Sequence, residues 1–247
     1  MASKTLVSLI IIVCVWLALS SSGSIKKALL PPPNEVFISL THLVTTEEFY
    51  IHYGSSMKRV LVAITVSSLS GIALGLAMGL SKTIHDHLHF PIDFLRTMPS
   101  PALIPMALLL FGITETARIA VITVTCTVMM TLNTIYGVAS VKKTRRNYFT
   151  IIKATPYQTL TKLVIPEAMP YIVTGLRTAL SVSLIVVVVT EMIMGTESGL
   201  GYIISENQLL YEIPEMYAYI LVLGITGYLL NYAVVRLEKK ILYWTGQ

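Results

Sequence analysis

Long apolar runs separated by polar segments are the feature that most constrains how this chain folds. Runs over residues 57–80, 119–138, 172–193 and 217–235 have about the 20-residue length that a helix needs to cross a bilayer. Only 13% of the 247 residues are charged and 54% are hydrophobic, whereas soluble domains carry charges at roughly a quarter of their positions. The sequence therefore predicts an all-α, polytopic membrane protein.

Another apolar run, residues 5–22, follows Lys4 and leaves two interpretations open. A short basic start, an apolar core and a tail of small residues also describe a cleavable signal peptide. Trp16 lies deep in the run and no sharp A-x-A cleavage site follows, so a retained transmembrane helix over residues 1–23 is favoured. Both interpretations place the N-terminus in the cytoplasm.

The segment between the runs at 119–138 and 172–193 is long and basic. Its residues 139–170 contain Lys142, Lys143, Arg145, Arg146, Lys153 and Lys162, and such a concentration of cations is typical of a cytoplasmic loop. Thr155 and Gln158 have capping-box spacing around Pro156, which predicts a helix that starts near Pro156 and ends before Pro166. A preceding helix is expected over about 146–153, and Pro166 is expected to open a third helix.

The remaining cations support one topology. Among the 18 Lys and Arg residues, only Lys26, Lys27, Lys58, Arg59 and Arg118 fall on the expected outer side, in keeping with the positive-inside bias. About six spans result, with both the N- and C-termini in the cytoplasm. We predict an N-terminal transmembrane helix (1–23), an extracytoplasmic segment (24–56), a membrane core (57–236) containing the cytoplasmic loop 139–170, and a cytoplasmic tail (237–247). An amphipathic surface helix is expected over residues 36–56.

Prolines interrupt the start of segment 96–118. Pro99, Pro101 and Pro105 stand at the mouth of a short apolar stretch, and Met98, Pro99 and Pro105 are candidates for lining a pathway or gate. Broken helix is tolerated at membrane depth only inside protein or beside a water-filled cavity. We therefore expect this segment to line the interior of the bundle. By contrast, Gly71, Gly75 and Gly79 recur on one helix face and predict close helix packing.

Glu191 lies near the end of the apolar run at 172–193, where a carboxylate is costly and usually faces the bundle interior or water. It has no evident titratable partner in the sequence. An interior hydrogen bond is therefore favoured over proton carriage. We place Glu191, Gly199 and Gly201 at the outer end of a pathway.

No catalytic or cofactor-binding residues are predicted in this chain. Nothing matches G-x-x-x-x-G-K-[ST], the phosphate-binding loop of ATPases, and no Ser/His/Asp or paired-carboxylate set converges in one segment. Cys14 and Cys126 lie inside apolar runs, so neither a disulfide nor a thiol metal site is indicated. The net charge of +5 belongs to loops beside apolar runs, so nucleic acid is not an expected partner.

His85, His87 and His89 raise the alternative of a metal site. His85 and His89 are one helical turn apart, but a tetrahedral site needs more ligands than the nearby Asp86 supplies. We favour a polar cytoplasmic turn and predict no metal site.

Four segments resemble ABC transporter permeases of the nitrate, sulfonate and taurine group. LLPPPNEVF (29–37), segment 96–118 and GTESGLGYII (195–204) are similar to segments of that group. ATPYQTLTKLVIPEAMPYIVTGLR follows its cytoplasmic pattern G-A-S-x-W-x-x-x-x-x-V-x-L-P-x-A-L-P-x-I-x-T-G-L-R, directly or by conservative change, at Ala154, Thr155, Tyr157, Val164, Ile165, Pro166, Ala168, Met169, Pro170, Thr174, Gly175, Leu176 and Arg177. The family's Glu-Ala-Ala triplet falls on Asn147, Tyr148 and Phe149, and its glycine on Lys153.

The resemblance implies a type I ABC importer permease fold, in the inner or plasma membrane, and a transport subunit that is not itself an enzyme. It implies a solute related to nitrate, sulfonates, taurine or bicarbonate, and no cofactor in this chain, since ATP and Mg belong to a partner. The implied partners are ATP-binding subunits, a second permease subunit (identical or different), an extracytoplasmic substrate-binding protein and membrane lipid. The implied coupling residues are Asn147, Phe149, Ile152, Lys153, Ala154, Thr155, Pro156, Tyr157 and Pro166.

Two other functions stay open on the sequence alone. A stand-alone secondary transporter is expected to show intramembrane ionisable groups and internal repeats, but Glu191 is nearly alone in the predicted spans and no repeat is evident. A membrane scaffold without transport is raised by the altered Glu-Ala-Ala triplet. Lys153 also poses a local question, because a glycine at this position ends a helix in the left-handed conformation without steric cost. We expect the break to be kept, since Thr155 still specifies a new helix start.

Overall fold

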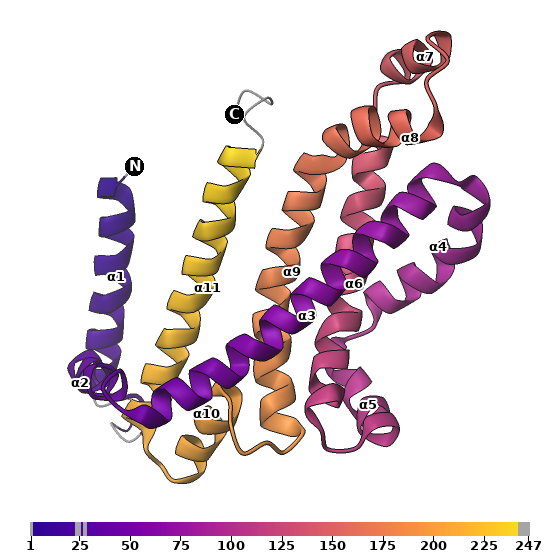
Figure 1. Cartoon of the computed structure of the whole chain (residues 1–247). Helices are drawn as coiled ribbons and strands as arrows, with labels where there is room; N and C mark the ends of the chain where they lie inside the picture. Colours follow the sequence, from indigo (N-terminus) through magenta and orange to yellow (C-terminus); the bar gives the residue numbers. More distant parts are fainter. Residues whose placement is uncertain (1, 23–25, 27–28, 242–247) are drawn as a thin grey trace.

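The computed structural model describes residues 2–22, 26 and 29–241 (Figure 1). Every regular element in this part of the chain is helical, which confirms the all-α prediction. In chain order these are α1 (Ala2–Ser21), α2 (Pro33–Leu43), α3 (Glu47–Leu80), α4 (Lys82–Thr97), a 3-10 turn (Ser100–Leu103), α5 (Ile104–Phe111), α6 (Glu115–Ala139), α7 (Lys143–Ile151), α8 (Pro156–Thr159), a π-helical turn (Leu160–Val164), α9 (Ile165–Ile193), α10 (Leu200–Leu209) and α11 (Ile213–Ile241). Of the expected tail, residues 242–247 lie outside the described residues.

Four of the described helices are long and apolar enough to cross a membrane: Glu47–Leu80, Glu115–Ala139, Pro156–Ile193 and Ile213–Lys240. A fifth span results if the pair Lys82–Thr97 and Ser100–Phe111, bent by 105°, is counted as one. The apolar part of α1, Ile10–Ser21, is shorter. The prediction of about six spans, and the division of the chain into segments, stay predictions.

The predicted surface helix over residues 36–56 is wrong. The chain breaks between α2 and α3, because Thr46 begins a new helix by accepting a hydrogen bond from the Phe49 amide on its side chain. α3 then runs unbroken for 34 residues, and it begins ten residues before the start of the span predicted over residues 57–80. At about 1.5 Å per residue this helix is longer than a bilayer core, so it is tilted or extends beyond the membrane.

The expected polar turn after α3 is also a helix. The Ser81 hydroxyl accepts from the Ile84 amide and so caps α4. α4 is amphipathic, and the side chain of Ile92 is buried against Met78 and Val128. The spacing of Ile84, Leu88 and Ile92, one helical turn apart, is the sequence pattern that indicates this amphipathic helix.

α6 lies at the centre of the packing, between α3 and α9. Gly75 of α3 approaches α6 so closely that a methyl group there would lie 2.7 Å from the Thr131 carbonyl oxygen and 2.5 Å from the Thr134 Cβ. Gly71 and Gly79 meet α6 at Thr127 and Val138 in the same way. The prediction of close packing from the glycine spacing is confirmed.

The two ends of the bundle differ. The start of α1, the end of α11 and the α7–α8 segment lie toward one end, whereas α2, α5 and α10 lie toward the other (Figure 1). This is the arrangement expected if both termini share a compartment with the basic loop. We refer to the two as the basic end and the opposite end.

We predict that Gly75→Ala destabilises the protein by about 1–3 kcal/mol, because the added methyl group overlaps a backbone carbonyl that cannot move away freely. Thermal unfolding in detergent measures the change. Gly54→Ala, in the same helix but with nothing within 4 Å of the new methyl group, serves as the control. It is expected to leave stability unchanged or slightly higher. Equal effects of the two substitutions would contradict the packing account.

Candidate functional site

The basic loop contains the predicted pair of short helices. α7 ends at Ile151 and α8 begins at Pro156. Thr155 and Gln158 form a complete capping box: the Gln158 amide donates to Thr155 Oγ1 at 3.2 Å, and the Thr155 amide donates to Gln158 Oε1 at 2.9 Å. Lys153 adopts the left-handed conformation with φ 51°. The prediction that the break survives without glycine is confirmed.

The prediction that a helix ends before Pro166 is wrong. α8 continues through the π-helical turn Leu160–Val164 into α9 without leaving helical geometry. Pro166 lacks the amide that a regular α-helical turn requires. It stands directly after the wider turn, in the first turn of α9, and such turns interrupt the regular hydrogen-bond ladder without ending a helix. α8 and α9 therefore form one continuous element of 38 residues.

The α7–α8 segment presents apolar and aromatic side chains to its surroundings. Ile151 is 78% exposed and Tyr157 75% exposed, and Tyr148 and Ile152 are also exposed. Among the other predicted coupling residues, Asn147, Lys153, Thr155 and Pro156 are exposed, whereas Phe149, Ala154 and Pro166 are half-buried. An ion pair between Arg145 and Glu167 ties α7 to the start of α9. Contiguous exposed apolar side chains on a rigid segment are typical of a protein interaction site.

The prediction that Glu191 lacks a titratable partner is wrong. The Glu191 side chain is fully buried and lies 2.6 Å from Arg59 Nη1 of α3. It also accepts hydrogen bonds from the Ser56 hydroxyl and, at 2.8 Å, from the Gly201 amide. The expected interior hydrogen bonds are therefore present, together with an ion pair.

This ion pair holds the loop that precedes α10. Arg59 Nη1 donates to the Ser198 carbonyl at 2.8 Å, and the Leu200 amide donates to the Ser56 hydroxyl at 2.8 Å. The Gly199 amide donates to His52 Nδ1 at 3.1 Å. Together with the contacts of Glu191, these hydrogen bonds join α3, α9 and the loop at the opposite end of the bundle.

Gly199 and Gly201 are required by the close approach of this loop. Gly199 has φ 138°, and a methyl group there would lie 2.5 Å from Glu191 Oε2 and 2.7 Å from Arg59 Nη1. A methyl group at Gly201 would overlap the Val188 carbonyl oxygen. Both glycines thus allow the backbone to contact the ion pair directly. No role for Arg59, His52 or Ser56 was predicted from the sequence, although their spacing places all three on one face of α3.

The ion pair extends to α6. Arg59 donates from Nε and Nη2 to the two carboxylate oxygens of Glu115, both at 2.7 Å. Arg118 donates to Glu115 Oε1 at 2.8 Å and to the Gly195 carbonyl oxygen. Arg59 and Arg118 are almost completely buried, whereas the Glu115 side chain is 56% exposed.

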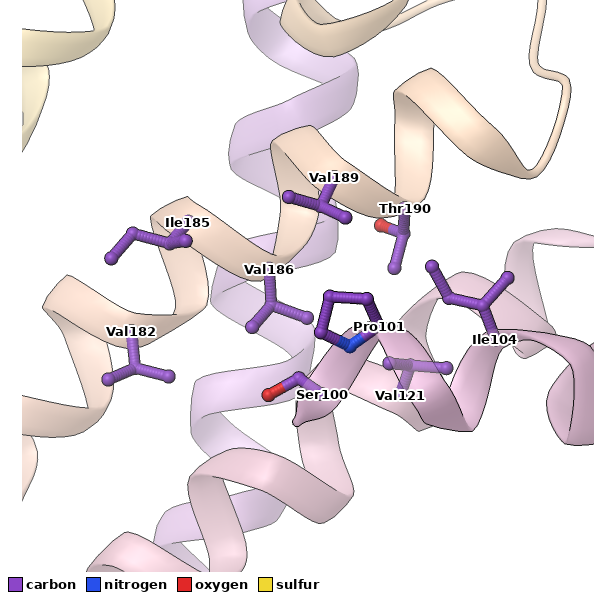
Figure 2. Close-up of a pocket in the computed structure, with 9 residues that line it drawn as sticks. All are labelled: Ser100, Pro101, Ile104, Val121, Val182, Ile185, Val186, Val189 and Thr190. Carbon is purple, nitrogen blue, oxygen red and sulfur yellow. The ribbon is translucent and has the colours of Figure 1, made fainter. Parts of the chain in front are cut away.

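A mostly apolar cavity of about 120 Å³ lies between α9, Val121 of α6 and the turn that precedes α5 (Figure 2). Ser100 and Thr190 contribute its only polar side chains, and Thr190 adjoins Glu191 in the chain. The predicted pathway residues Met98, Pro99 and Pro105 are close to lining residues in the chain, but none of the three lines the cavity. Their role in a pathway stays a prediction.

The histidines of α4 have other partners. His89 lies 3.3 Å from Asp93, and His87 Nδ1 is 2.7 Å from the Thr83 carbonyl oxygen. Within the described part of the chain, no three His, Cys, Asp or Glu side chains are placed to hold a metal ion.

Comparison with known proteins decides the family. Residues 71–242 match the family described as "Binding-protein-dependent transport system inner membrane component". The chain belongs to this family. It is thus a multi-pass protein of the inner membrane and a permease of the ABC importer type, rather than a stand-alone secondary transporter or a scaffold.

The relatives of this permease include the taurine transport system permease protein TauC of Escherichia coli (strain K12), 29% identical over 97% of this chain and 89% of its own length. The nitrate import permease protein NrtB of Synechocystis sp. is 30% identical over 95% of this chain and 87% of its own length. The putative aliphatic sulfonates transport permease protein SsuC of Bacillus subtilis (strain 168) is 27% identical over 95% of this chain and 84% of its own length.

Solved structures agree on the fold. A chain of the MetNI methionine ABC transporter, in an inward-facing conformation, has a TM-score of 0.63 at 20% identity, over 74% of this permease and 93% of that chain. A chain of an amino acid ABC transporter solved with histidines has a TM-score of 0.61 at 17% identity, over 84% of this permease and 96% of that chain. The permease fold predicted from the sequence is confirmed.

We predict that Lys153→Gly stabilises the permease by about 0.4–1 kcal/mol, because glycine reaches the left-handed conformation without the steric cost borne by lysine. Chemical unfolding of the purified protein measures the change. Gly195→Ala, at φ 58° with nothing within 4 Å of the new methyl group, is the reverse control and is expected to destabilise by a similar amount. A lower stability of the Lys153→Gly variant would contradict the prediction.

We predict that Glu191→Ala destabilises the permease by about 3–5 kcal/mol, because it leaves Arg59 buried without one of its two carboxylate partners. Glu238→Ala is the comparison, since its ion pair with Arg177 is longer, at 3.5 Å, and partly exposed. That substitution is expected to cost about 1 kcal/mol or less. Comparable losses in the two variants would show that burial does not set the strength of the Glu191 contacts.

Proposed function

We propose that this permease forms, with a second permease subunit, the path by which an ABC importer admits a small solute that carries an oxyanion group. Relatives of this permease are named as transporting aliphatic sulfonates, taurine, nitrate or bicarbonate, and all of these solutes carry such a group. An extracytoplasmic substrate-binding protein delivers the solute to the opposite end of the bundle. ATP and Mg are bound by separate ATP-binding subunits, and this chain itself performs no catalysis.

The observation that carries the proposal is the exposed, capped α7–α8 segment at the basic end. It combines a complete capping box with exposed Ile151, Ile152 and Tyr157. A segment of this kind fits a cleft of an ATP-binding subunit, because its shape is fixed before binding and its apolar side chains are available for burial. We call the α7–α8 segment the docking element. The other predicted coupling residues belong to it or to its base: Asn147, Phe149, Lys153, Ala154, Thr155, Pro156 and Pro166.

Movement of the docking element is transmitted through α9. Because α8, the π-helical turn and α9 are continuous, a displacement of α8 shifts α9 rather than being absorbed in a loop. The far end of α9 carries Glu191, which holds the loop with Gly199 and Gly201. ATP binding favours one arrangement of the ATP-binding subunits, and the differential affinity for the two arrangements of the spans drives transport.

The second permease subunit, identical or different, has an apolar surface available to it. Leu109 of α5 is 88% exposed and Ile185 of α9 65% exposed, and Leu110 and Ile113 are similarly uncovered. Membrane lipid covers the remaining apolar surface. The cavity beside Met98, Pro99 and Pro105 lies on the α5 and α9 side, so the proposed path runs between the two subunits.

Cysteine cross-linking tests the docking element. In the assembled importer, Tyr157→Cys is expected to cross-link to the ATP-binding subunit. Tyr211→Cys, equally exposed but in the turn between α10 and α11 at the opposite end, is expected not to do so. It is expected to react with a membrane-impermeant thiol reagent added from outside. Cys14 and Cys126 are first replaced to remove background. Reaction of the position-157 cysteine with the same external reagent would contradict the proposed orientation.

A further inference from the structure

Two buried arginines hold one displaceable carboxylate at the opposite end of the bundle. We propose that Arg59 and Arg118 form an oxyanion-binding site, that the Glu115 carboxylate occupies it in this structure, and that an oxyanion at the outer mouth of the path displaces Glu115. The proposal rests on the proposed function for its orientation and substrate class. It assigns that substrate class a specific site in the membrane subunit.

The contacts of Glu115 are those that a small oxyanion makes. Arg59 offers Nε and Nη2 side by side to two oxygen atoms, both at 2.7 Å, and Arg118 adds a third donor at 2.8 Å. The planar guanidinium fork matches any group with two oxygens on one central atom, including carboxylate, sulfonate, nitrate and bicarbonate. Among the described residues, Arg118 Nε is buried without a hydrogen-bond partner, so this guanidinium is not fully satisfied by protein groups.

The two arginines keep their positions without Glu115. Arg59 Nη1 is held by Glu191 and by the Ser198 carbonyl, and Arg59 Nη2 also donates to Thr196 Oγ1 at 3.3 Å. Arg118 is held through Nη2 by the Gly195 carbonyl. An anion that replaces Glu115 therefore meets donors that are already oriented, which lowers the entropic cost of binding.

Glu115 itself is placed to leave. It is the first residue of α6, its side chain is 56% exposed, and residues 111–116 around it are all exposed. Its carboxylate can turn toward water with little loss of packing. The negatively charged group of an incoming oxyanion takes the place of the Glu115 carboxylate. After the exchange, the positive charges of Arg59 and Arg118 still face two negative groups, the Glu191 carboxylate and the oxyanion. Glu115 thus protects the arginines when the site is empty and competes with the ligand when it is present.

Binding of radiolabelled sulfate to the purified, detergent-solubilised permease complex tests the site. Removal of the competing carboxylate by Glu115→Gln is expected to tighten sulfate binding about tenfold or more. Unlabelled nitrate and taurine are expected to compete, and choline is not. Glu115→Ala is a second variant with the same expected direction, and it keeps the test available if the glutamine variant is poorly folded.

Two variants control for charge and for location. Glu197→Gln removes one exposed negative charge from the same loop region without touching either arginine, and is expected to change sulfate affinity less than about twofold. The double variant Glu115→Gln with Arg118→Gln is expected to lose the increase in sulfate affinity that Glu115→Gln alone produces. Equal affinity in Glu115→Gln and Glu197→Gln, or full binding in the double variant, would overturn the site. Because this readout is binding without ATP, a failed site is distinguishable from a failed importer assignment, which appears as absent cross-linking at Tyr157.

Discussion

The buried ion pair between Arg59 and Glu191 is the interaction on which the opposite end of this permease depends. Burial of both charges is costly, and the cost is offset only when every group around them is hydrogen-bonded. Ser56, the Gly201 amide and Glu115 supply those bonds. The need to satisfy one pair therefore fixes the relative positions of α3, α6, α9 and the loop before α10. It also explains why positions 199 and 201 are glycines, since a side chain at either position would overlap the ion pair or the Val188 carbonyl.

α9 connects this end to the basic end. The continuous helix Pro156–Ile193 has 38 residues and spans roughly 55 Å, from the exposed Tyr157 to the buried Glu191. Pro166 and Pro170 interrupt its hydrogen-bond ladder near the basic end, next to the π-helical turn. Bending is expected there, because those turns lack regular bonds, while the part beyond Thr174 moves as a unit. A helix of this kind transmits displacement between the docking element and the loop that Glu191 holds.

The sequence predicted correctly those structural features that depend on residues close together in the chain. The capping box at Thr155 and Gln158 and the break at Lys153 depend on residues within one turn, and both are present. The glycine spacing in α3 likewise predicted close packing, because a helix face follows directly from the period. Segment motifs predicted the permease family, which comparison with known proteins then confirmed.

Contacts between distant helices escaped prediction. Arg59 and Glu191 are 132 residues apart, and the sequence places Arg59 only at the expected outer side, without a partner. Pro166 was predicted to stop a helix because the rule for proline is local. The wider turn before it accommodates the missing amide instead. The 36–56 segment was misassigned because Thr46 resembles an ordinary loop residue until its hydrogen bond to Phe49 is known.

Transport in proteoliposomes tests the central claim most directly. The permease is reconstituted with its ATP-binding subunits, and the binding protein and radiolabelled taurine, nitrate, bicarbonate or sulfonate are supplied on the outer side. The account predicts uptake of one or more of these solutes that requires internal ATP and persists when a protonophore dissipates the proton gradient. Uptake that proceeds without ATP and follows the imposed proton gradient would contradict it.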